Sequence, residues 1–166
     1  MRVEKMYYTF GGLHMFGIGV IAPAYSPYML SIGLSLAEIS LVNAVFWIVM
    51  ICAELPTGML ADGKSRAWSL KFGALFFGTG AAGYSIATDV TSVALSEAVI
   101  GIGASMVSGA KQAWITDALD KVGRKEDVRK VFATDAIITS FLMMAGGFIG
   151  AYIATINYRY IWGSLI

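Results

Sequence analysis

The chain alternates long apolar stretches with short polar connections. A helix needs about 20 mostly apolar residues to cross the hydrocarbon core of a bilayer. Five stretches fit this requirement, and a sixth begins near Tyr160 and runs to Ile166. The predicted spans are about 7–30, 39–61, 70–87, 92–116, 131–156 and, in part, 160–166. Because no Gly/Ser-rich linker divides them, we expect a single transmembrane domain over residues 1–166.

The composition also indicates a membrane protein. Hydrophobic residues make up 57% of the chain and charged residues only 14%, whereas soluble domains carry about 25% charged residues. A soluble fold would lack the polar side chains to cover its surface. We therefore predict an all-α, polytopic bundle that is embedded in a lipid bilayer. We expect this bilayer to be the cell membrane, that is, the plasma or inner membrane. The net charge of +1 gives no indication of nucleic-acid binding.

The cationic residues of the connections predict an orientation. Basic residues near the ends of spans favour the cytoplasmic side. Only Arg159 falls on one side of the predicted membrane, and we expect the N-terminus and both basic loops on the other, cytoplasmic side. The cations on that side are Arg2, Lys5, Lys64, Arg66, Lys71, Lys121, Arg124, Lys125, Arg129 and Lys130.

Small residues recur four positions apart in three of the spans. Helices in a membrane associate through close backbone packing, which small residues allow. We expect these positions to lie at helix contacts. They are Ala74, Gly78 and Ala82, then Gly101, Ser105 and Gly109, and finally Gly146 and Gly150.

Several polar groups lie within the spans, where an ionisable side chain is costly and suggests a function. His14 falls on one helical face with Tyr7, Tyr25 and Tyr28. It is either a proton or substrate site, since histidine titrates near neutral pH, or a histidine packed between helices.

The second predicted span also carries a polar face. Asn43, Trp47, Glu54 and Thr57 share it. Glu54 lies near the cytoplasmic end. It either takes part directly in transport or bonds to the backbone at the membrane interface.

The fourth predicted span has the most polar face. Glu97, Gly101, Ala104, Ser108 and Lys111 fall in a stripe about 80° wide. We expect this stripe to line a cavity, with interhelical structural polarity as the alternative. Glu97 and Lys111 lie about 21 Å apart along the axis, so each needs its own partner.

Asp135 lies about one turn inside the fifth predicted span, next to Arg129 and Lys130. The favoured interpretation is an interfacial ion pair with this basic run, and the alternative is a proton site. Cys52 and His14 are the only residues of their types, so neither a disulfide nor a metal site is expected. Enzyme motifs are lacking as well. No catalytic function and no cofactor are predicted.

One connection has a recognisable motif. Residues 54–70 read Glu-Leu-Pro-Thr-Gly-Met-Leu-Ala-Asp-Gly-Lys-Ser-Arg-Ala-Trp-Ser-Leu. This resembles the signature loop between the second and third helices of major facilitator superfamily transporters, which it matches at Gly58, Asp62, Arg66 and Leu70. The Glu-Leu-Pro-Thr-Gly segment is similar to a subgroup of drug or metabolite efflux carriers. Similar segments at 33–40, 108–117 and 158–160 extend the resemblance over nearly the whole chain.

The resemblance implies the first six-helix repeat of a transporter that works by alternating access. Its substrate would be a small molecule, and a proton or ion gradient would supply the energy. The signature loop would form part of an inner gate. There Gly58 would admit a neighbouring helix, and Asp62 would accept hydrogen bonds from a helix N-terminus. We expect Arg66 to pair with Asp117.

Some residues depart from the family pattern. Gly63, Ser65 and Ala67 differ from the residues of the family motif. As a result, the loop lacks two of the cations that the motif usually carries. Glu97 stands where proton antiporters of the family often carry arginine, and the glycines at 146–150 lack the proline of the antiporter motif. Glu97 thus becomes the first candidate for ion coupling, and His14 the second.

The length admits three readings, because members of the family have about twelve helices in two repeats. The chain is a truncated N-terminal half that lacks its C-terminal half. Alternatively, it is a half-size carrier that pairs with itself or with a second chain. The third reading is a non-transporting membrane protein of assembly or regulation.

Overall fold

The computed structural model describes residues 3–63, 65–157 and 161, except the side chains of Asp62 and Gly63. Within this part every regular element is a helix. Most of the partial sixth span predicted at 160–166 lies outside the described residues. The elements are α1 (Val3–Ile21), η1 (Ala22–Ala24), α2 (Tyr25–Ser31), α3 (Leu36–Gly63), α4 (Arg66–Ile86), α5 (Val90–Asp120), η2 (Lys125–Asp127) and α6 (Val128–Ile156).

Each of the five longer predicted ranges coincides with a helical segment. Among the described residues, three helical stretches are both long and apolar enough to cross a membrane: Leu36–Ala61, Val90–Asp120 and Lys125–Ile156. The first predicted range is bent, because a 3-10 turn containing Pro23 separates α1 from α2. Proline lacks the backbone N–H that would continue the α-helical pattern.

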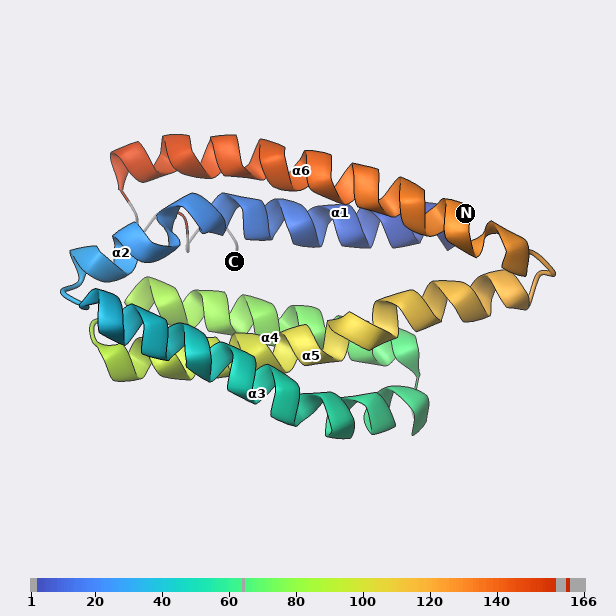
Figure 1. Cartoon of the computed structure of the whole chain (residues 1–166), viewed down its shortest axis with the longest axis horizontal. Coiled ribbons are helices and arrows are strands. Elements are labelled where there is room, and N and C mark those ends of the chain that lie inside the picture. Colours follow the sequence, from blue (N-terminus) through green and yellow to red (C-terminus); the bar gives the residue numbers. More distant parts are fainter. Residues whose placement is uncertain (1–2, 64, 158–160, 162–166) are drawn as a thin grey trace.

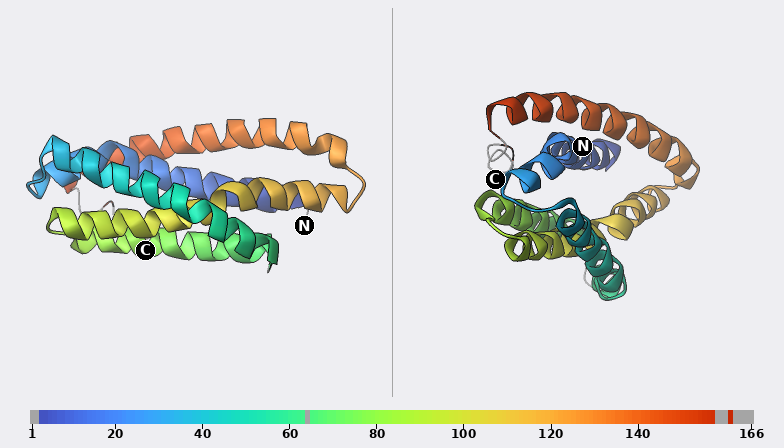
Figure 2. Two further views of the ribbon diagram at one scale, coloured as in Figure 1. Left: turned by 60° about the horizontal axis from the view of Figure 1, so that its bottom comes forward. Right: turned by 60° about the vertical axis from the view of Figure 1, so that its left-hand side comes forward.

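The helices form two groups that run roughly along one direction (Figure 1). In one group α1 and α6 lie side by side, and in the other α3, α4 and α5 pack together. The C-terminal part of α5 leaves its group and leads into α6, which the two turned views also show (Figure 2). α5 is therefore the element that joins the two groups.

Glycines set the closest helix contacts. A Cβ atom at Gly103 would lie 2.8 Å from the carbonyl oxygen of Gly73, so α4 and α5 touch backbone to backbone. Gly146 and Gly150 confirm their predicted packing role, because a Cβ atom there would overlap the backbone of α1 at Phe16 and Val20.

The prediction also holds at Gly101, where a Cβ atom would lie 2.9 Å from the carbonyl oxygen of Phe46, but it is wrong at three other positions. A Cβ atom at Gly78 or Gly109 would meet open space, and Ala74 is exposed. The true contact face of α4 runs through Gly73 and Gly80. A spacing of four identifies small residues on a shared face, but it does not say which face another helix covers.

The two ends of the bundle are closed by polar contacts. At the start of α5 the Asp89 carboxylate accepts a hydrogen bond from the Ser92 backbone N–H (2.8 Å), and this bond lowers the pKa of Asp89. At the other end Arg124 donates to Glu4 of α1 and to Asp127, both at 2.7 Å. The loop before α6 is thereby tied to the first helix.

The outer surfaces of α3 and α6 are apolar. Only 11% of the most apolar window in each of these helices is buried, against 50% in α5. Large hydrophobic side chains such as Ile51, Leu55, Phe141 and Phe148 are more than half exposed. A helix that is apolar on its outer face is suited to lipid. α5 is the central helix, and α3 and α6 present their apolar faces outward.

Candidate functional site

Three polar clusters lie at different depths along the bundle. They are centred on Arg66 and Asp117 at one end, on Lys111 and Asp135 further in, and on Glu97 towards the opposite end. All three include a residue of α5.

The first cluster joins the start of α4 to the last turns of α5. Ser65 caps α4 by accepting a hydrogen bond from the Trp68 backbone N–H (3.1 Å), which places Arg66 in the first turn. The Arg66 Nε atom lies 2.8 Å from Asp117 Oδ2, with the two side chains 30% and 50% exposed. The expected pair therefore forms. Partly exposed pairs of this kind contribute only about 0–1 kcal/mol, so this one can break and reform readily.

Two hollows adjoin this pair. One of about 450 Å³ is lined by Arg66 and Asp117, among others, and one of about 530 Å³ lies between α3, α4 and α5. The second contains Glu54, Gly58 and Ser108. Glu54 is exposed, and no described residue lies within 4 Å of a Cβ atom placed on Gly58. The expectation that Gly58 admits a neighbouring helix therefore stays a prediction, because no described helix packs against it. The side chain of Asp62 lies outside them.

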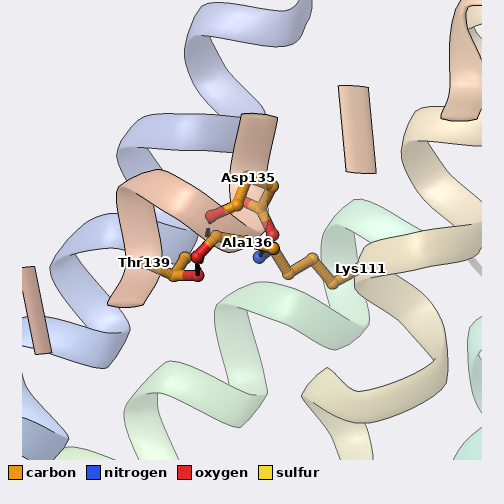
Figure 3. Close-up of polar contacts among 4 residues, drawn as sticks. All are labelled: Lys111, Asp135, Ala136 and Thr139. Atoms are coloured by element: carbon orange, nitrogen blue, oxygen red, sulfur yellow. Dashed lines mark hydrogen bonds and ion pairs between the residues drawn. The ribbon is translucent and has the colours of Figure 1, made fainter. Parts of the chain in front are cut away.

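The second cluster is an ion pair between α5 and α6 (Figure 3). Lys111 Nζ lies 2.7 Å from Asp135 Oδ2, and the side chains are only 15% and 13% exposed. The Lys111 ammonium also lies 4.5 Å from the centre of the Tyr7 ring on α1, in a cation–π arrangement. Gly11 makes room for it, because a Cβ atom there would overlap Lys111 Nζ.

This pairing corrects the expectation for Asp135. Its partner is Lys111 of a different helix, not the adjacent Arg129 and Lys130, which are exposed. The helical period places Asp135 on the inner face of α6, away from its basic neighbours. Its second oxygen, Oδ1, is buried and accepts no hydrogen bond of ordinary geometry from the described residues.

The third cluster surrounds Glu97, whose side chain is almost completely buried. Glu97 Oε1 accepts hydrogen bonds from the hydroxyls of Tyr25 (2.7 Å) and Tyr84. The adjacent Tyr28 hydroxyl donates to the carbonyl oxygen of Tyr84 (2.6 Å). These tyrosines come from α2 and α4, so the cluster fixes the position of α2 after the bend.

The Glu97 cluster borders a pocket of about 360 Å³. Its lining comes from α1, η1, α2, α3, α4 and α5. The residues are Ile18, Ile21, Ala22, Tyr25, Asn43, Phe46, Phe77, Tyr84, Glu97 and Ile100. We expected the polar stripe from Glu97 to Lys111 on α5 to line a cavity. Glu97 does border this pocket, whereas Gly101 packs directly on α3 near Phe46 and Met50. Asn43 of the second predicted polar face reaches the pocket, but Glu54 does not.

His14 has different surroundings from those predicted. Its ring stacks on Phe10 and meets Phe77 of α4 edge to face, with centroids 6.2 and 5.1 Å away. It lies in a separate hollow of about 300 Å³. The bend at Ala22–Ala24 moves Tyr25 and Tyr28 off the helical face that His14 occupies. The packed histidine is the interpretation that these contacts favour.

Two tyrosines of the Glu97 cluster were missed as its partners. Tyr84 lies near the end of α4 and Glu97 near the start of α5, and the two helices form a hairpin with a short turn. Residues on either side of such a turn face each other, and this signal could have identified Tyr84 as a partner of Glu97. Tyr25 gave no such signal, because its position depends on the bend. Among the described residues no group of three His, Cys, Asp or Glu side chains gathers as a metal site.

Comparison with known proteins agrees with the resemblance seen in the signature loop. The family model described as Major Facilitator Superfamily matches residues 8–166. The chain is also similar to an uncharacterised MFS-type transporter of Methanocaldococcus jannaschii, at 26% identity over 140 residues. That alignment covers 84% of this chain and 35% of the relative, so the chain spans about a third of the length of the curated relative it matches.

Proposed function

Because this chain belongs to the major facilitator superfamily, a family of multi-pass membrane transporters and not of enzymes, we propose that it serves efflux of a small molecule by alternating access. It acts as the first repeat of a carrier and needs a second set of helices to complete the pathway. The efflux direction follows from the resemblance of residues 54–58 to the efflux-like subgroup.

The second set of helices is either a C-terminal half or a second chain, including another copy of this one. The short coverage of the archaeal relative supports this part of the proposal. So does Gly58, a residue of the signature loop that no described residue packs against. A neighbouring helix of the second repeat would have room to approach there.

The observation that carries the proposal is the Arg66–Asp117 ion pair at 2.8 Å. It joins α4 to α5 beside the signature loop, and the Glu97 pocket lies towards the other end of the same helix α5. A weak, half-exposed pair is suited to a gate because opening it costs about 1 kcal/mol or less. The basic loops around it support a cytoplasmic position for this end.

Energy comes from a proton or ion gradient in this proposal, so that the carrier works as an antiporter. Glu97 is the first candidate for the coupling group because it is a carboxylate buried beside a pocket. His14 is the second, and the Lys111–Asp135 pair is a further charged group within the bundle. Buried ionisable groups within membrane helices commonly mark such pathways.

A labelling experiment on the native carrier tests the gate. Ser108→Cys places a reporter in the hollow beside Arg66, and Cys52→Ser removes the exposed native thiol. We expect Arg66→Ala and Asp117→Ala each to raise the rate of labelling by a cytoplasmic maleimide severalfold, because the closed end opens more often.

Lys130→Ala is the control, since it removes an exposed cation elsewhere on the same side. Its labelling rate should equal that of the parent. If Arg66→Ala and Asp117→Ala also leave the rate unchanged, the pair is not a gate.

A further inference from the structure

The pocket beside Glu97 has walls of a particular kind. Most of its lining is aliphatic or aromatic, with rings from Tyr25, Phe46, Phe77 and Tyr84. Its only other polar side chain besides these hydroxyls and Glu97 is the amide of Asn43. A volume of about 360 Å³ falls in the range of small-molecule sites, which are mostly apolar with a few placed polar groups.

The charge in this pocket is not balanced within the described chain. Glu97 is 4% exposed, and it forms no ion pair with a described lysine or arginine. Lys111, the cation within the same helix, lies about 21 Å away along the axis and is held by Asp135. A buried carboxylate without a counter-ion is costly in an apolar setting.

The hydrogen bonds at Glu97 fix the position of its carboxyl group. The hydroxyls of Tyr25 and Tyr84 both donate to the same oxygen, Oε1. Two hydroxyl donors on one oxygen hold the carboxyl group in place at the wall of the pocket. The aromatic faces around it attract a cation as well, through their negative π-faces.

We propose that this pocket binds an organic cation with an apolar, aromatic-sized body, whose charge pairs with Glu97. This assignment deepens the proposed transport function and rests on it, because it names the substrate class. An anion would be repelled by the carboxylate. A small inorganic cation would need more oxygen ligands than one carboxylate and one amide supply.

Binding to the complete carrier, purified with all its helices from its native membranes, tests the substrate class with two probes of the same shape and opposite charge. Tetraphenylphosphonium is the cation and tetraphenylborate is the anion, each measured by equilibrium dialysis against a protein-free detergent control. We expect the wild-type carrier to bind the cation at least tenfold more tightly than the anion. This comparison requires no variant.

Two variants locate the site. Glu97→Gln keeps the shape and an oxygen that can accept from the tyrosines, and it should weaken cation binding at least tenfold. Glu126→Gln is the matched control, an identical change at an exposed carboxylate in the loop before α6, and it should leave binding unchanged. Ile18→Trp keeps the charge but fills the pocket, and it should also abolish cation binding.

Several results would overturn the assignment. They are no binding of the cation by the wild type, equal or tighter binding of the anion, or cation binding that survives both Glu97→Gln and Ile18→Trp. Failure here leaves the gate experiment on Arg66 and Asp117 untouched, so a transporter of another substrate class would still be recognised by its labelling response.

Discussion

At the scale of single residues, the charges buried within the described part of the chain each have a polar partner on another helix. Lys111 of α5 holds Asp135 of α6, while Glu97 of α5 accepts from tyrosines of α2 and α4. These contacts are made where water is scarce, so their electrostatic strength is high and the loss of one partner is costly. The pairs therefore position α5 relative to both helix groups.

Breaking the buried ion pair should destabilise the bundle. Lys111→Met leaves the Asp135 carboxylate buried without its counter-ion, and we expect a loss of about 3–5 kcal/mol in the free energy of unfolding. Thermal unfolding of the purified chain in detergent would show this as a lower midpoint. The Lys125→Met control alters a lysine that is 70% exposed and 3.7 Å from Asp120, and it should change little.

The double variant Lys111→Met/Asp135→Leu separates charge from packing. It removes both charges, and replacing a buried pair with apolar residues is often neutral or stabilising. Its midpoint should therefore recover most of the loss. A double variant as unstable as the single one would contradict the electrostatic explanation.

The sequence predicted some of these residue contacts and not others. The Arg66–Asp117 pair followed from the resemblance of the signature loop, and the separate partners of Glu97 and Lys111 followed from their distance along one helix. The identity of those partners did not follow. Helical periodicity gives the face of a residue, but it does not give the helix that the face meets. Asp135 was therefore assigned to its neighbours in sequence when its partner lay on α5.

At the scale of elements, close backbone contact determines how the helices pack. α6 lies against α1 through Gly146 and Gly150, and α4 lies against α5 through Gly73 and Gly103. Helices in lipid gain little from a hydrophobic drive, so such contacts contribute much of their association. The ends are set separately by capping groups such as Asp89.

Adding a side chain at one of these glycines should separate α1 from α6. A Cβ atom at Gly150 would overlap the carbonyl oxygen of Val20. We expect Gly150→Val to cost about 1–3 kcal/mol through overpacking, measured as a lower unfolding midpoint. Gly78→Val makes the same change where a Cβ atom meets open space. Equal losses in the two variants would show that the glycine contact is not what holds α6.

Element positions were easier to predict than element contacts. The apolar stretches alone located all five long helical segments, because length and hydrophobicity decide where a helix can lie in lipid. The bend at Ala22–Ala24 was missed, although Pro23 and Pro27 are visible in the sequence. The stripe of small residues at 74, 78 and 82 misled, since a face of small residues allows close packing but does not show that another helix covers it.

At the scale of the whole molecule, the bundle has a charged end and an apolar outer surface. Seven of the twelve cations lie in the connection after α5 and in the first turns of α4 and α6, and α3 and α6 expose large hydrophobic side chains. This distribution predicts an orientation with the Arg66–Asp117 end in the cytoplasm.

Cysteine labelling in intact cells tests that orientation. In a Cys52→Ser background, Thr88→Cys reports on the α4–α5 turn and Glu126→Cys on the loop before α6; both native residues are exposed. An impermeant maleimide added outside should label Thr88→Cys at once, and Glu126→Cys only after the membrane is permeabilised. The reverse order would place the basic loops outside.

The central claim is that this chain supplies one repeat of a carrier that a second set of helices completes. Its most direct test is the size of the native product in source membranes, read by immunoblot before and after crosslinking with an antibody against residues 121–127. The chain alone has a mass of 17.7 kDa. We predict a band of about twice that mass or more, either as one polypeptide or as a crosslinked pair. A band that stays at the mass of the single chain under both conditions would contradict the claim.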